Sequence, residues 1–488
     1  MPPLRLLALD LGAESGRALI GAFDGSNLAL DEVHRFPNVP VRLRDTLYWD
    51  FLRLFDEVLA GIRAAHGGGE VASVGVDTWG VDFGLIDSRG RLLGNPVHYR
   101  DARTAGMLER AIGRLSADTI YGTTGIQFIP INTLYQLLSM AVLQDPELNR
   151  ADRLLMMADL INHFLCDSAV AEYTNATTTQ CLDVSTRTWA TDMLTALEIP
   201  TRIFPEVVPP GTKLGQLRED LGGHLTVIAP GTHDTASAIA ATPLPKDGHT
   251  AYLSSGTWSL VGVELRQPLL TPAAQASNLT NEGGVEGTIR LLKNVMGLWL
   301  IQVARHDVAL SYAELTSAAA DARAFTAVVD PDDERFLRVQ PADLPRVVRE
   351  VCHETGQPPP ADLPTLVRVL LESLALKYAV VLHQLESATG RAIDAVHVVG
   401  GGSNNALLCQ LTADACGVPV RAGPAEATAL GNVLVQAIAL GELASLEQAR
   451  ELVARSFPAR RYEPQADWSE PRERFSTLWQ AQVQGVSP

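Results

Sequence analysis

Three stretches of the chain share one pattern, in which an apolar run, a glycine-containing polar turn and a second apolar run follow one another. They are Leu6–Phe23 (LLALDLGAESGRALIGAF), Val71–Asp87 (VASVGVDTWGVDFGLID) and Thr250–Leu265 (TAYLSSGTWSLVGVEL). Turn residues between runs of β-favouring side chains predict hairpins or strand connections. The first and third stretches lie about half a chain length apart, which indicates two related halves.

Helical periodicity is clearest in the second half. Between Leu363 and Gly390, apolar residues recur at steps of three and four, which predicts a long helix that ends at the glycine. We then expect a strand over Ala395–Val399, a glycine turn, a helix that reaches Ala415 and a short strand over Val418–Arg421. The following segment, PAEATALGNVLVQAIALG, predicts another helix. Strands that alternate with helices indicate an α/β fold with mixed sheets.

The segment TPLPKDGH interrupts this pattern between Ala241 and Thr250 with prolines and a glycine. A chain of 488 residues is too long for one ordinary core. We therefore expect two domains, over residues 1–243 and 244–488. The tail from about Ser456 is polar until a last helix.

Charge and cysteine content narrow the class of protein. A formal net charge of −17 argues against a nucleic-acid partner, which needs clustered Lys and Arg, but it leaves room for a small anion held by backbone N–H groups. The 5 cysteines include no CxxC pair, and no apolar run is long enough to span a bilayer. We expect a cytoplasmic protein in a reducing compartment, with no membrane partner. The oligomeric state stays open.

Glycine-bearing turns supply the first candidate binding sites, because they expose backbone N–H groups at short range. DLGAESGR follows Asp10 with a turn and an arginine, SSGTW holds Thr257, and VVGGGSNN places Gly402 between a strand and a helix. The residues of the first turn are Ala13, Glu14, Ser15, Gly16 and Arg17. Each of the first two turns is compatible with a phosphate loop or an ordinary hairpin. The glycine spacings fit neither the Rossmann nor the P-loop motif.

Asp234 is the one acid in PGTHDTASAIAA, between His233 and Thr235. It can cap a helix, bind a metal or accept a proton. Metal binding is the weakest of the three, since no third ligand stands at useful spacing. The small residues that follow predict a helix with Asp234 as its N-cap, whose backbone N–H groups would hold the carboxylate ionised. A structural, hydrogen-bonded role remains the ordinary interpretation of His233.

Several longer motifs together resemble the FGGY carbohydrate kinases. They are GVDTWGVDFGLID, YRDARTAG, THDTASAI, YLSSGTWSLVG, NEGGVEGTIRLLKNVMGLWLIQ and VVGGGSNNALLCQLTADACGVPV, and they run in order to about Gly441. The first and fifth are most similar to the rhamnulokinase subfamily. The resemblance implies an actin-like ATPase (ribonuclease H-like) α/β fold, with two related domains around a central cleft. It assigns the sugar and the first phosphate loop to residues 1–243, and the nucleotide side to residues 244–488.

The resemblance also implies roles for individual residues. Asp234 matches the general base and Asp10 an acid near metal-bound phosphates. Sugar contacts match Gly80, His233, Asp234 and Thr235. ATP contacts match Ala13, Glu14, Ser15, Gly16, Arg17, Thr257, Asn294, Gln302 and Gly402.

Other polar residues stay ambiguous on the sequence alone. Asn294 and Gln302 stand eight positions apart, and on a helix they would share a face. The set from Tyr99 to Arg103 is either a salt-bridged surface turn or part of the sugar pocket. Trp79 is either core or a sugar-facing ring.

The implied reaction is the ATP-dependent phosphorylation of L-rhamnulose at O1, with Mg²⁺ and with Asp234 as base. One alternative is a family member acting on another ketose, such as L-fuculose or xylulose. Another is an actin-like ATPase switch without a sugar acceptor, and a third is a catalytically inactive binding protein.

Overall fold

The chain forms two compact units in the computed structural model, which describes residues 3–246, 248–306, 308–337 and 339–483. Unit 1 comprises Met1–Pro243, Glu264–Leu291 and Ala427–Phe457, and unit 2 comprises Leu244–Val263, Leu292–Glu426 and Pro458–Pro488. The first segment of unit 1 ends where we expected a domain boundary. Two later segments also belong to unit 1, so the compact units are not two continuous halves of the chain.

The main sheet of unit 1 has the strand order β13-β14-β6-β1-β2-β3. Its strands are β13 (Lys213–Gln216), β14 (Thr226–Ile228), β6 (Ser73–Thr78), β1 (Leu4–Leu11), β2 (Ser15–Phe23) and β3 (Leu28–Pro37). β1 pairs antiparallel with β2 and parallel with β6, which confirms the first predicted hairpin. β6 and β14 are also parallel, so the carboxyl ends of β1, β6 and β14 share one edge.

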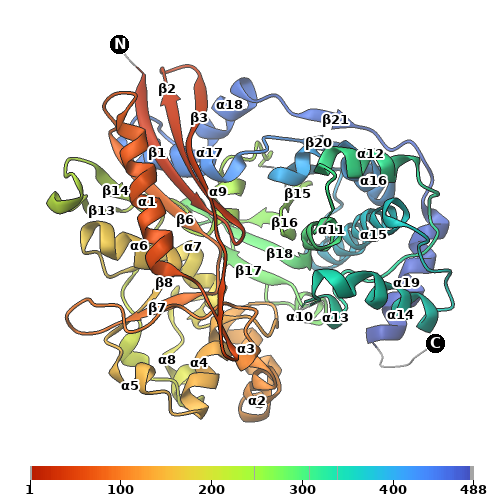
Figure 1. Cartoon of the computed structure of the whole chain (residues 1–488), viewed down its shortest axis with the longest axis horizontal. Coiled ribbons are helices and arrows are strands. Elements are labelled where there is room, and N and C mark those ends of the chain that lie inside the picture. The colour runs from red at the N-terminus through yellow and green to blue at the C-terminus, as the bar shows by residue number, and fades with distance from the viewer. Residues whose placement is uncertain (1–2, 247, 307, 338, 484–488) are drawn as a thin grey trace. The chain divides into compact units, whose positions relative to one another are not determined.

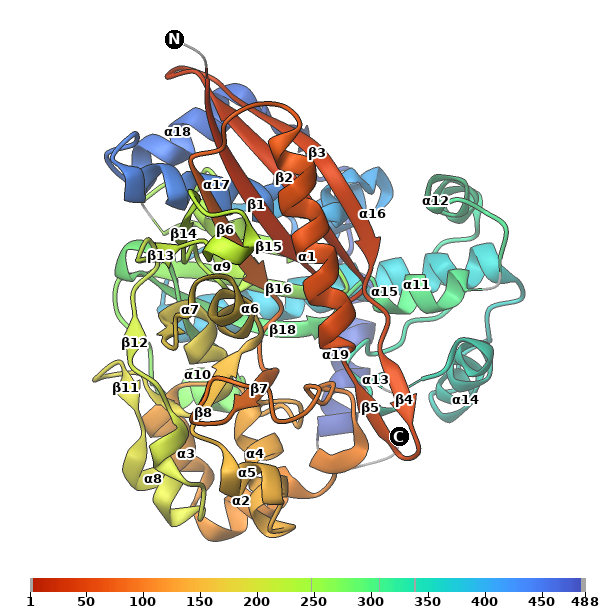
Figure 2. The same cartoon turned by 60° about the vertical axis from the view of Figure 1, so that its left-hand side comes forward.

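Helices cover both faces of this sheet. Figure 2 shows α1 (Phe51–His66) crossing β1, β2 and β3, where a side chain at Gly61 would meet Ala18 and Leu9. α17 (Ala427–Leu440) packs against β1 and β6, and a side chain at Gly75 would meet Asn432 of this helix. Glycine at these sheet and helix positions therefore permits close packing.

The remaining elements of unit 1 surround this sheet or extend from it. Short strand pairs are β4 (Val41–Leu43) with β5 (Thr46–Tyr48), β7 (Phe83–Ile86) with β8 (Arg153–Met156), β9 (Ala171–Glu172) with β12 (Val207–Val208), and β10 (Leu182–Asp183) with β11 (Thr188–Trp189). The helices are α2 (Met107–Arg114), α3 (Ala117–Thr124), α4 (Thr133–Val142), α5 (Pro146–Arg150), α6 (Met157–Cys166), α7 (Tyr173–Ala176), α8 (Thr191–Ala196), α9 (Asp234–Ala240), α10 (Pro272–Ala276) and α18 (Leu446–Ser456).

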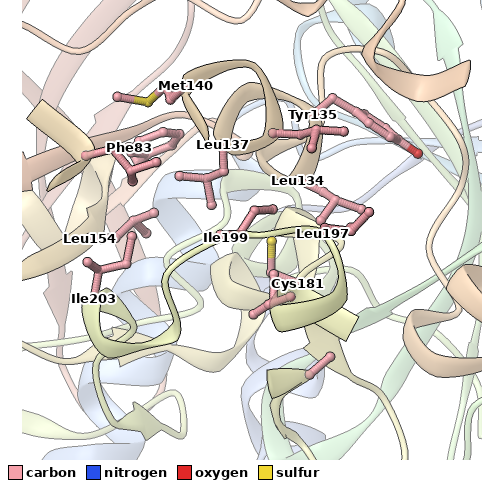
Figure 3. Close-up of a cluster of buried hydrophobic side chains, with 14 of the residues drawn as sticks. Phe83, Leu134, Tyr135, Leu137, Met140, Leu154, Cys181, Leu197, Ile199 and Ile203 are labelled. Atoms are coloured by element: carbon pink, nitrogen blue, oxygen red, sulfur yellow. The ribbon is translucent and has the colours of Figure 1, made fainter. Parts of the chain in front are cut away.

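A buried apolar cluster anchors β7 directly after the DTWGVD motif. Phe83 lies among Leu137 and Met140 of α4 and Leu154 of β8, and Figure 3 shows these side chains together. Their burial removes apolar surface from water, at roughly 25 cal/mol per Å². This apolar cluster therefore fixes the end of the β6–β7 turn at Phe83.

The second large sheet has the order β17-β18-β16-β15-β19-β20-β21. Its strands are β17 (Thr280–Gly283), β18 (Ile289–Met296), β16 (Trp258–Leu265), β15 (Thr250–Ser255), β19 (Ala395–Val399), β20 (Val420–Ala422) and β21 (Arg460–Tyr462). β15 pairs antiparallel with β16 and parallel with β19, which repeats the pattern of β1, β2 and β6. This shared strand-pairing pattern is the structural basis for the expected two related halves. β21 lies in the tail, where we expected no strand.

Helix α15 (Leu363–Thr389) forms the centre of the helical layer of unit 2. It ends at Gly390, whose left-handed conformation is the predicted stop signal. In Figure 1, α15 lies with α16 (Ala406–Cys416) and α12 (Tyr312–Asp321), which contact it. The other helices are α11 (Trp299–Arg305), α13 (Glu334–Leu337), α14 (Leu344–Glu354) and α19 (Ser469–Val483). Within the described ranges, no helix combines the length and apolar character needed to cross a membrane.

Candidate active site

The carboxyl ends of the strands of unit 1 bring together residues that are far apart in sequence. Asp10 of β1 stands directly opposite Asp77 in the parallel register with β6. The next residue, Thr78, donates its backbone N–H to Thr232 O at 2.9 Å, and Thr232 immediately precedes the His233–Asp234 pair. The sheet topology therefore gathers acids from β1, β6 and the loop after β14 at one edge.

The turn after β1 is a short hairpin connection, and the ion pair of Asp10 and Arg17 flanks it. Gly12 N donates to Ser15 O at 2.9 Å, and Asn38 closes the turn by donating its Nδ2 to Gly12 O at 3.0 Å. Arg17 Nη2 lies 2.5 Å from Asp10 Oδ2. Arg17 is thus an ion-pair partner of Asp10 instead of a freely solvated arginine, and the pair stands beside the predicted phosphate turn.

Asp77 is a buried carboxylate with one unused oxygen. Its Oδ2 accepts a hydrogen bond from Asn432 Nδ2 of α17 at 2.6 Å, whereas no described residue bonds its buried Oδ1. Burial, and then the negative charge of Asp10, raise the pKa of Asp77 well above its ordinary value. A buried oxygen without a partner needs an explanation, and an ordered water or a bound ion is one.

Asp234 is the first residue of α9, which corrects its prediction as the N-cap. His233 takes the N-cap position, without a side-chain capping bond. Asp234 Oδ1 accepts from Thr235 N at 2.5 Å and Thr235 Oγ1 at 3.1 Å, while no described residue bonds Oδ2. The side chain keeps 31% of its surface exposed, so part of it is accessible to a ligand.

The electrostatic setting of Asp234 also differs from our expectation. We expected backbone N–H groups to hold the carboxylate ionised. Burial raises the pKa of Asp234, His233 opposes this shift, and the negative charge of Asp10 adds to it. The hydrogen bonds from Thr235 lower the pKa, but the net shift is still upward. Asp234 is therefore a stronger proton acceptor than an ordinary surface aspartate.

His233 belongs to a buried charged network that sequence reasoning missed. Arg290 Nη2 lies 3.1 Å from His233 Nδ1 and 3.1 Å from Glu282 Oε2. In this contact the guanidinium donates and Nδ1 accepts, while Glu282 Oε2 lies 3.3 Å from the same nitrogen. His233 Nε2 is 3.4 Å from Asp234 Oδ1. The network turns the Nε2 edge of His233 toward the carboxylate.

A second buried acid, Glu172, fixes the loop that carries His233. Its Oε2 accepts from Thr232 N at 3.0 Å and from Thr232 Oγ1 at 2.7 Å. Glu172 Oε2 also accepts a hydrogen bond from Thr174 Oγ1. The Thr174 hydroxyl oxygen in turn accepts a hydrogen bond from His233 N at 3.2 Å. The loop before α9 is therefore bonded on several sides and has little freedom to move.

Gly80 lies in the turn between β6 and β7, where a side chain would stand 2.9 Å from Thr178 Oγ1. Trp79 is 6% exposed, its ring centroid lies 4.2 Å from that of Trp49, and its Nε1 donates to Asp82 Oδ2 at 3.0 Å. The ring is therefore packed in the core.

The set from Tyr99 to Arg103 joins the same cluster and is not a surface turn. Tyr99 and Asp101 are buried, Tyr99 N donates to Asp82 Oδ2 at 3.2 Å, and Arg103 Nη2 donates to Gln136 Oε1 at 2.5 Å. The other interpretation, that the set forms part of the sugar pocket, stays a hypothesis.

In unit 2, Thr257 and Gly402 stand on loops that meet at the end of β15. Gly297 N and Trp299 N donate to Thr257 O, each at 3.2 Å. A side chain at Gly402 would lie 2.0 Å from Ser255 Oγ, so only glycine permits this approach. The SSGT turn, the β18–α11 connection and the triple-glycine turn therefore form one cluster of backbone and hydroxyl groups.

The shared-helix interpretation of Asn294 and Gln302 is wrong. Asn294 lies in strand β18 and Gln302 in helix α11, with Gly297 between the two elements. The apolar run around Asn294 is a buried strand, which periodicity alone does not distinguish from a helix. Gln302 Oε1 is buried and accepts no hydrogen bond from the described residues.

Sequence reasoning assigned no role to Glu172, Asp82, Glu282 and Arg290. A signal was present for Glu172, Asp82 and Arg290, because these residues interrupt apolar or hydroxyl-rich runs, as Arg290 does in GTIRLLKN, whereas the surroundings of Glu282 in NLTNEGG give none. Buried charges of this kind need partners. Among the described residues, no group of three or more His, Cys, Asp and Glu side chains could hold a metal ion by itself.

Comparison with known proteins agrees with this architecture. Residues 5–240 match the N-terminal domain, and residues 251–440 the C-terminal domain, of the FGGY family of carbohydrate kinases. A rhamnulokinase of Bacteroides thetaiotaomicron is 44% identical over 94% of this chain and 95% of its own. A rhamnulokinase of Pectobacterium carotovorum subsp. carotovorum is 42% identical over 98% and 97%.

Solved structures show the fold. The gluconate kinase of Lactobacillus acidophilus superposes with a TM-score of 0.79 at 18% identity, over 99% of this chain and 98% of its own. The predicted actin-like α/β fold is confirmed. The chain belongs to the FGGY family of carbohydrate kinases.

Proposed function

We propose that this chain transfers a phosphoryl group from ATP to O1 of L-rhamnulose. The observation that carries the proposal is Asp234, whose raised pKa and unbonded Oδ2 suit a proton acceptor. The choice of sugar is supported by similarity to the rhamnulokinases of B. thetaiotaomicron and P. carotovorum across nearly the full chain.

Asp234 would remove the proton of the attacking hydroxyl as the oxygen–phosphorus bond forms. A sugar hydroxyl is a poor nucleophile at neutral pH, and a positioned base contributes about 10²- to 10⁴-fold. The proton passes to the Asp234 carboxylate, the γ-phosphoryl group passes to O1, and ADP leaves. A base with a raised pKa binds that proton better than an ordinary aspartate does.

His233 would bind the sugar and orient Asp234. Because Nδ1 faces Arg290 and Glu282, Nε2 is the ring nitrogen that faces Asp234 and would contact a sugar hydroxyl. Thr235 and Gly80 complete the proposed acceptor contacts. Thr235 fixes Asp234 Oδ1, and Gly80 follows two residues after Thr78, which forms a β-bridge with His233.

One observation in unit 1 supports a binding site for Mg²⁺. It is commonly held by one or two carboxylates together with substrate phosphates and water, and it does not need a cage made only of protein. Asp10, and the buried Asp77 Oδ1 without a partner, provide such oxygens next to the phosphate turn. The ion supplies charge neutralisation at the phosphates. Asp10 and Asp77 would hold it, and Arg17 would share the charge of Asp10.

ATP would be bound by backbone and amide groups. The proposed contacts in unit 1 are Ala13, Glu14, Ser15, Gly16 and Arg17. Those in unit 2 are Thr257, Asn294, Gln302 and Gly402. Neutral N–H and hydroxyl donors stabilise phosphate oxygens without needing counter-charges, which suits an acidic chain. We accordingly assign the sugar and the first phosphate loop to residues 1–243, and the nucleotide side to residues 244–488.

We also place the protein in the reducing cytoplasm. All five cysteines are free, and burial raises the thiol pKa of Cys166, Cys181, Cys352, Cys409 and Cys416. Protonated thiols of this kind are unreactive.

A panel of ketoses tests the function. ADP release would be measured with L-rhamnulose, L-fuculose and D-xylulose, and ³¹P NMR would identify the phosphorylated carbon. We expect the highest kcat/KM for L-rhamnulose, with phosphate on C1. A higher kcat/KM for another ketose would reject the sugar, and ATPase activity that no sugar stimulates would reject the kinase.

A further inference from the structure

The turn from Trp79 to Asp82 lies beside the loop of Asp234 but has no assigned task apart from Gly80. Thr78, the residue before the turn, bonds to Thr232 and forms a β-bridge with His233. The residue after it, Phe83, is held in the apolar cluster of Figure 3. The turn is therefore pinned at both ends, with one end at the proposed acceptor site.

Val81 occupies a strained conformation in this turn. Its φ is 66°, and of the described non-glycine residues with positive φ it alone is β-branched. Such a residue is a steric outlier in the left-handed region. It persists only where the surroundings enforce it. Strain of this kind concentrates at functional sites.

Hydrogen bonds from two other segments, helix α4 and the turn that holds Thr178, enforce the conformation of Val81. Thr178 Oγ1 accepts from Val81 N at 3.1 Å. Thr133 Oγ1 donates to Val81 O at 2.7 Å, and Gln136 Nε2 donates to the same oxygen at 3.1 Å. Both backbone groups of the strained residue are therefore bonded to side chains.

Asp82 holds the rest of the turn from inside the core. Its Oδ2 accepts from Trp49 Nε1 at 2.6 Å and from Trp79 Nε1 at 3.0 Å. The same oxygen accepts from Tyr99 N, and Oδ1 accepts from Gln136 Nε2 at 3.1 Å. Asp82 is fully buried, and this burial raises its pKa to about 6. A buried carboxylate is tolerated here because donors surround it.

We propose that Asp82 is a positioning residue that keeps the Trp79–Asp82 turn in one strained conformation, so that Gly80 meets the sugar acceptor beside Asp234. The inference rests on the proposed function and adds to it a residue that does not touch substrate. One carboxylate orders two indoles, a backbone N–H and Gln136, and Gln136 in turn bonds Val81. The acceptor then meets a preformed wall and does not have to order it on binding.

This arrangement predicts a selective kinetic effect. If the turn is free to move, sugar binding must order it. The free-energy cost of that ordering raises the KM for the sugar. The nucleotide contacts proposed in unit 2 do not involve the turn, so the KM for ATP should stay constant. A residue with only a structural role would lower the amount of folded enzyme and would leave both KM values unchanged.

Val81→Gly and Asp82→Asn test the inference. Val81→Gly removes the strain but keeps the backbone hydrogen bonds. Asp82→Asn keeps an acceptor for the indoles but turns a donor toward Gln136. We expect each variant to raise the sugar KM about tenfold or more, with the ATP KM within about twofold of wild type. Near-UV circular dichroism should also change in Asp82→Asn, because Trp49 and Trp79 lose their fixed geometry.

Matched controls separate this effect from lost stability. Asp167→Gly relieves another positive φ, of 58°, at an exposed helix end. Glu372→Gln changes another fully buried carboxylate, which accepts from Phe325 N at 2.8 Å and Arg368 Nε at 2.6 Å in unit 2. Both controls should leave the sugar KM unchanged, whatever they do to the melting temperature.

The outcomes distinguish this inference from the function on which it rests. If the wild type phosphorylates a ketose but both turn variants keep its KM, the inference is wrong and the proposed function stands. If the wild type phosphorylates none of the ketoses, the proposed function fails, and the placement of an acceptor beside Gly80 fails with it. If the controls raise the sugar KM as much as the turn variants do, the effect is not specific to the turn and the inference is wrong.

Discussion

The hairpins of β1–β2 and β15–β16 follow one strand plan but carry different chemistry. Each first strand pairs antiparallel with the next strand and parallel with a later one, β6 or β19. At the ends of β1 and β6 stand Asp10 and Asp77, whereas the corresponding ends of β15 and β19 lead into Ser255 and Gly400. One backbone arrangement therefore supports a charged site in unit 1 and a neutral, donor-rich site in unit 2.

This difference has a physical consequence. Clustered carboxylates raise one another's pKa, which suits proton transfer and cation binding. Glycines and hydroxyls bring N–H and O–H donors close to a ligand without adding negative charge, which suits phosphates. We therefore expect variants in unit 1 to affect chemistry and cation use, and variants in unit 2 to affect nucleotide binding.

The largest expected effect is on Asp234. Asp234→Asn removes the proposed base with little change of volume, so kcat should fall about 10²- to 10⁴-fold. Steady-state ADP release with L-rhamnulose measures it, with Asp167→Gly as a control on the surface of the same unit. Turnover close to wild type would show that Asp234 is not the base and that the acids of unit 1 do not carry the chemistry.

Replacing Asp10 should alter cation use. Asp10→Asn removes a proposed Mg²⁺ ligand and leaves Arg17 without its ion-pair partner. The Mg²⁺ concentration for half-maximal activity should rise about 10- to 100-fold. A magnesium titration at saturating ATP and sugar measures the shift. An unchanged titration midpoint would remove Asp10 from the cation site.

In unit 2, Gly402→Ala should weaken ATP binding. The new methyl group would collide with Ser255, 2.0 Å from its Oγ, and displace the glycine turn. We expect the ATP KM to rise about tenfold, which corresponds to the loss of one hydrogen bond. Gly401→Ala is the matched control, because a side chain there meets nothing within 4 Å. Equal effects in both variants would contradict a specific role for Gly402.

The pH dependence of activity should follow the acids of unit 1. The deprotonated form of Asp234 accepts the proton, so kcat/KM falls as pH falls through its pKa. Burial and Asp10 raise that pKa, so the acid limb should lie above the ordinary value of 3.8. Asp10→Asn removes a negative neighbour and should move the limb to lower pH. A limb that moves to higher pH in this variant would contradict the electrostatic account.

The smallest expected effect is on Gln302. Gln302→Leu removes a buried amide whose Oε1 has no hydrogen bond among the described residues, and it keeps the volume of the side chain. If ATP donates to this oxygen, the ATP KM should rise about 2- to 10-fold. A lower ATP KM would show instead that the unsatisfied amide only destabilises the site.

Local patterns predicted much of this fold, whereas distant partners escaped prediction. β19 and the end of α15 at Gly390 follow from short-range signals, and both lie where we expected them. The Asn294–Gln302 interpretation failed because Gly297 ends a strand inside an unbroken apolar run. Asp234 missed the N-cap position by one residue, since His233 already pairs with Thr78 as an extension of the sheet.

Side-chain partners far apart in sequence explain what the pattern did not reveal. The bond between Asn432 and Asp77 joins residues 355 positions apart, and the contact of Arg290 with His233 spans 57. Nothing near Asp77 in sequence indicates that α17 covers it. The motif residues marked the site, but the network that tunes them became visible only once the sheet brought the strands together.

Calorimetric titration of a non-hydrolysable ATP analogue tests the division between the two units most directly. It would compare wild type with Asp234→Asn and Gly402→Ala at fixed Mg²⁺. We predict that Asp234→Asn, although nearly inactive, binds the analogue within about threefold of wild type, while Gly402→Ala binds it about tenfold more weakly. Equal loss of affinity in both variants, or a greater loss in Asp234→Asn, would contradict the account.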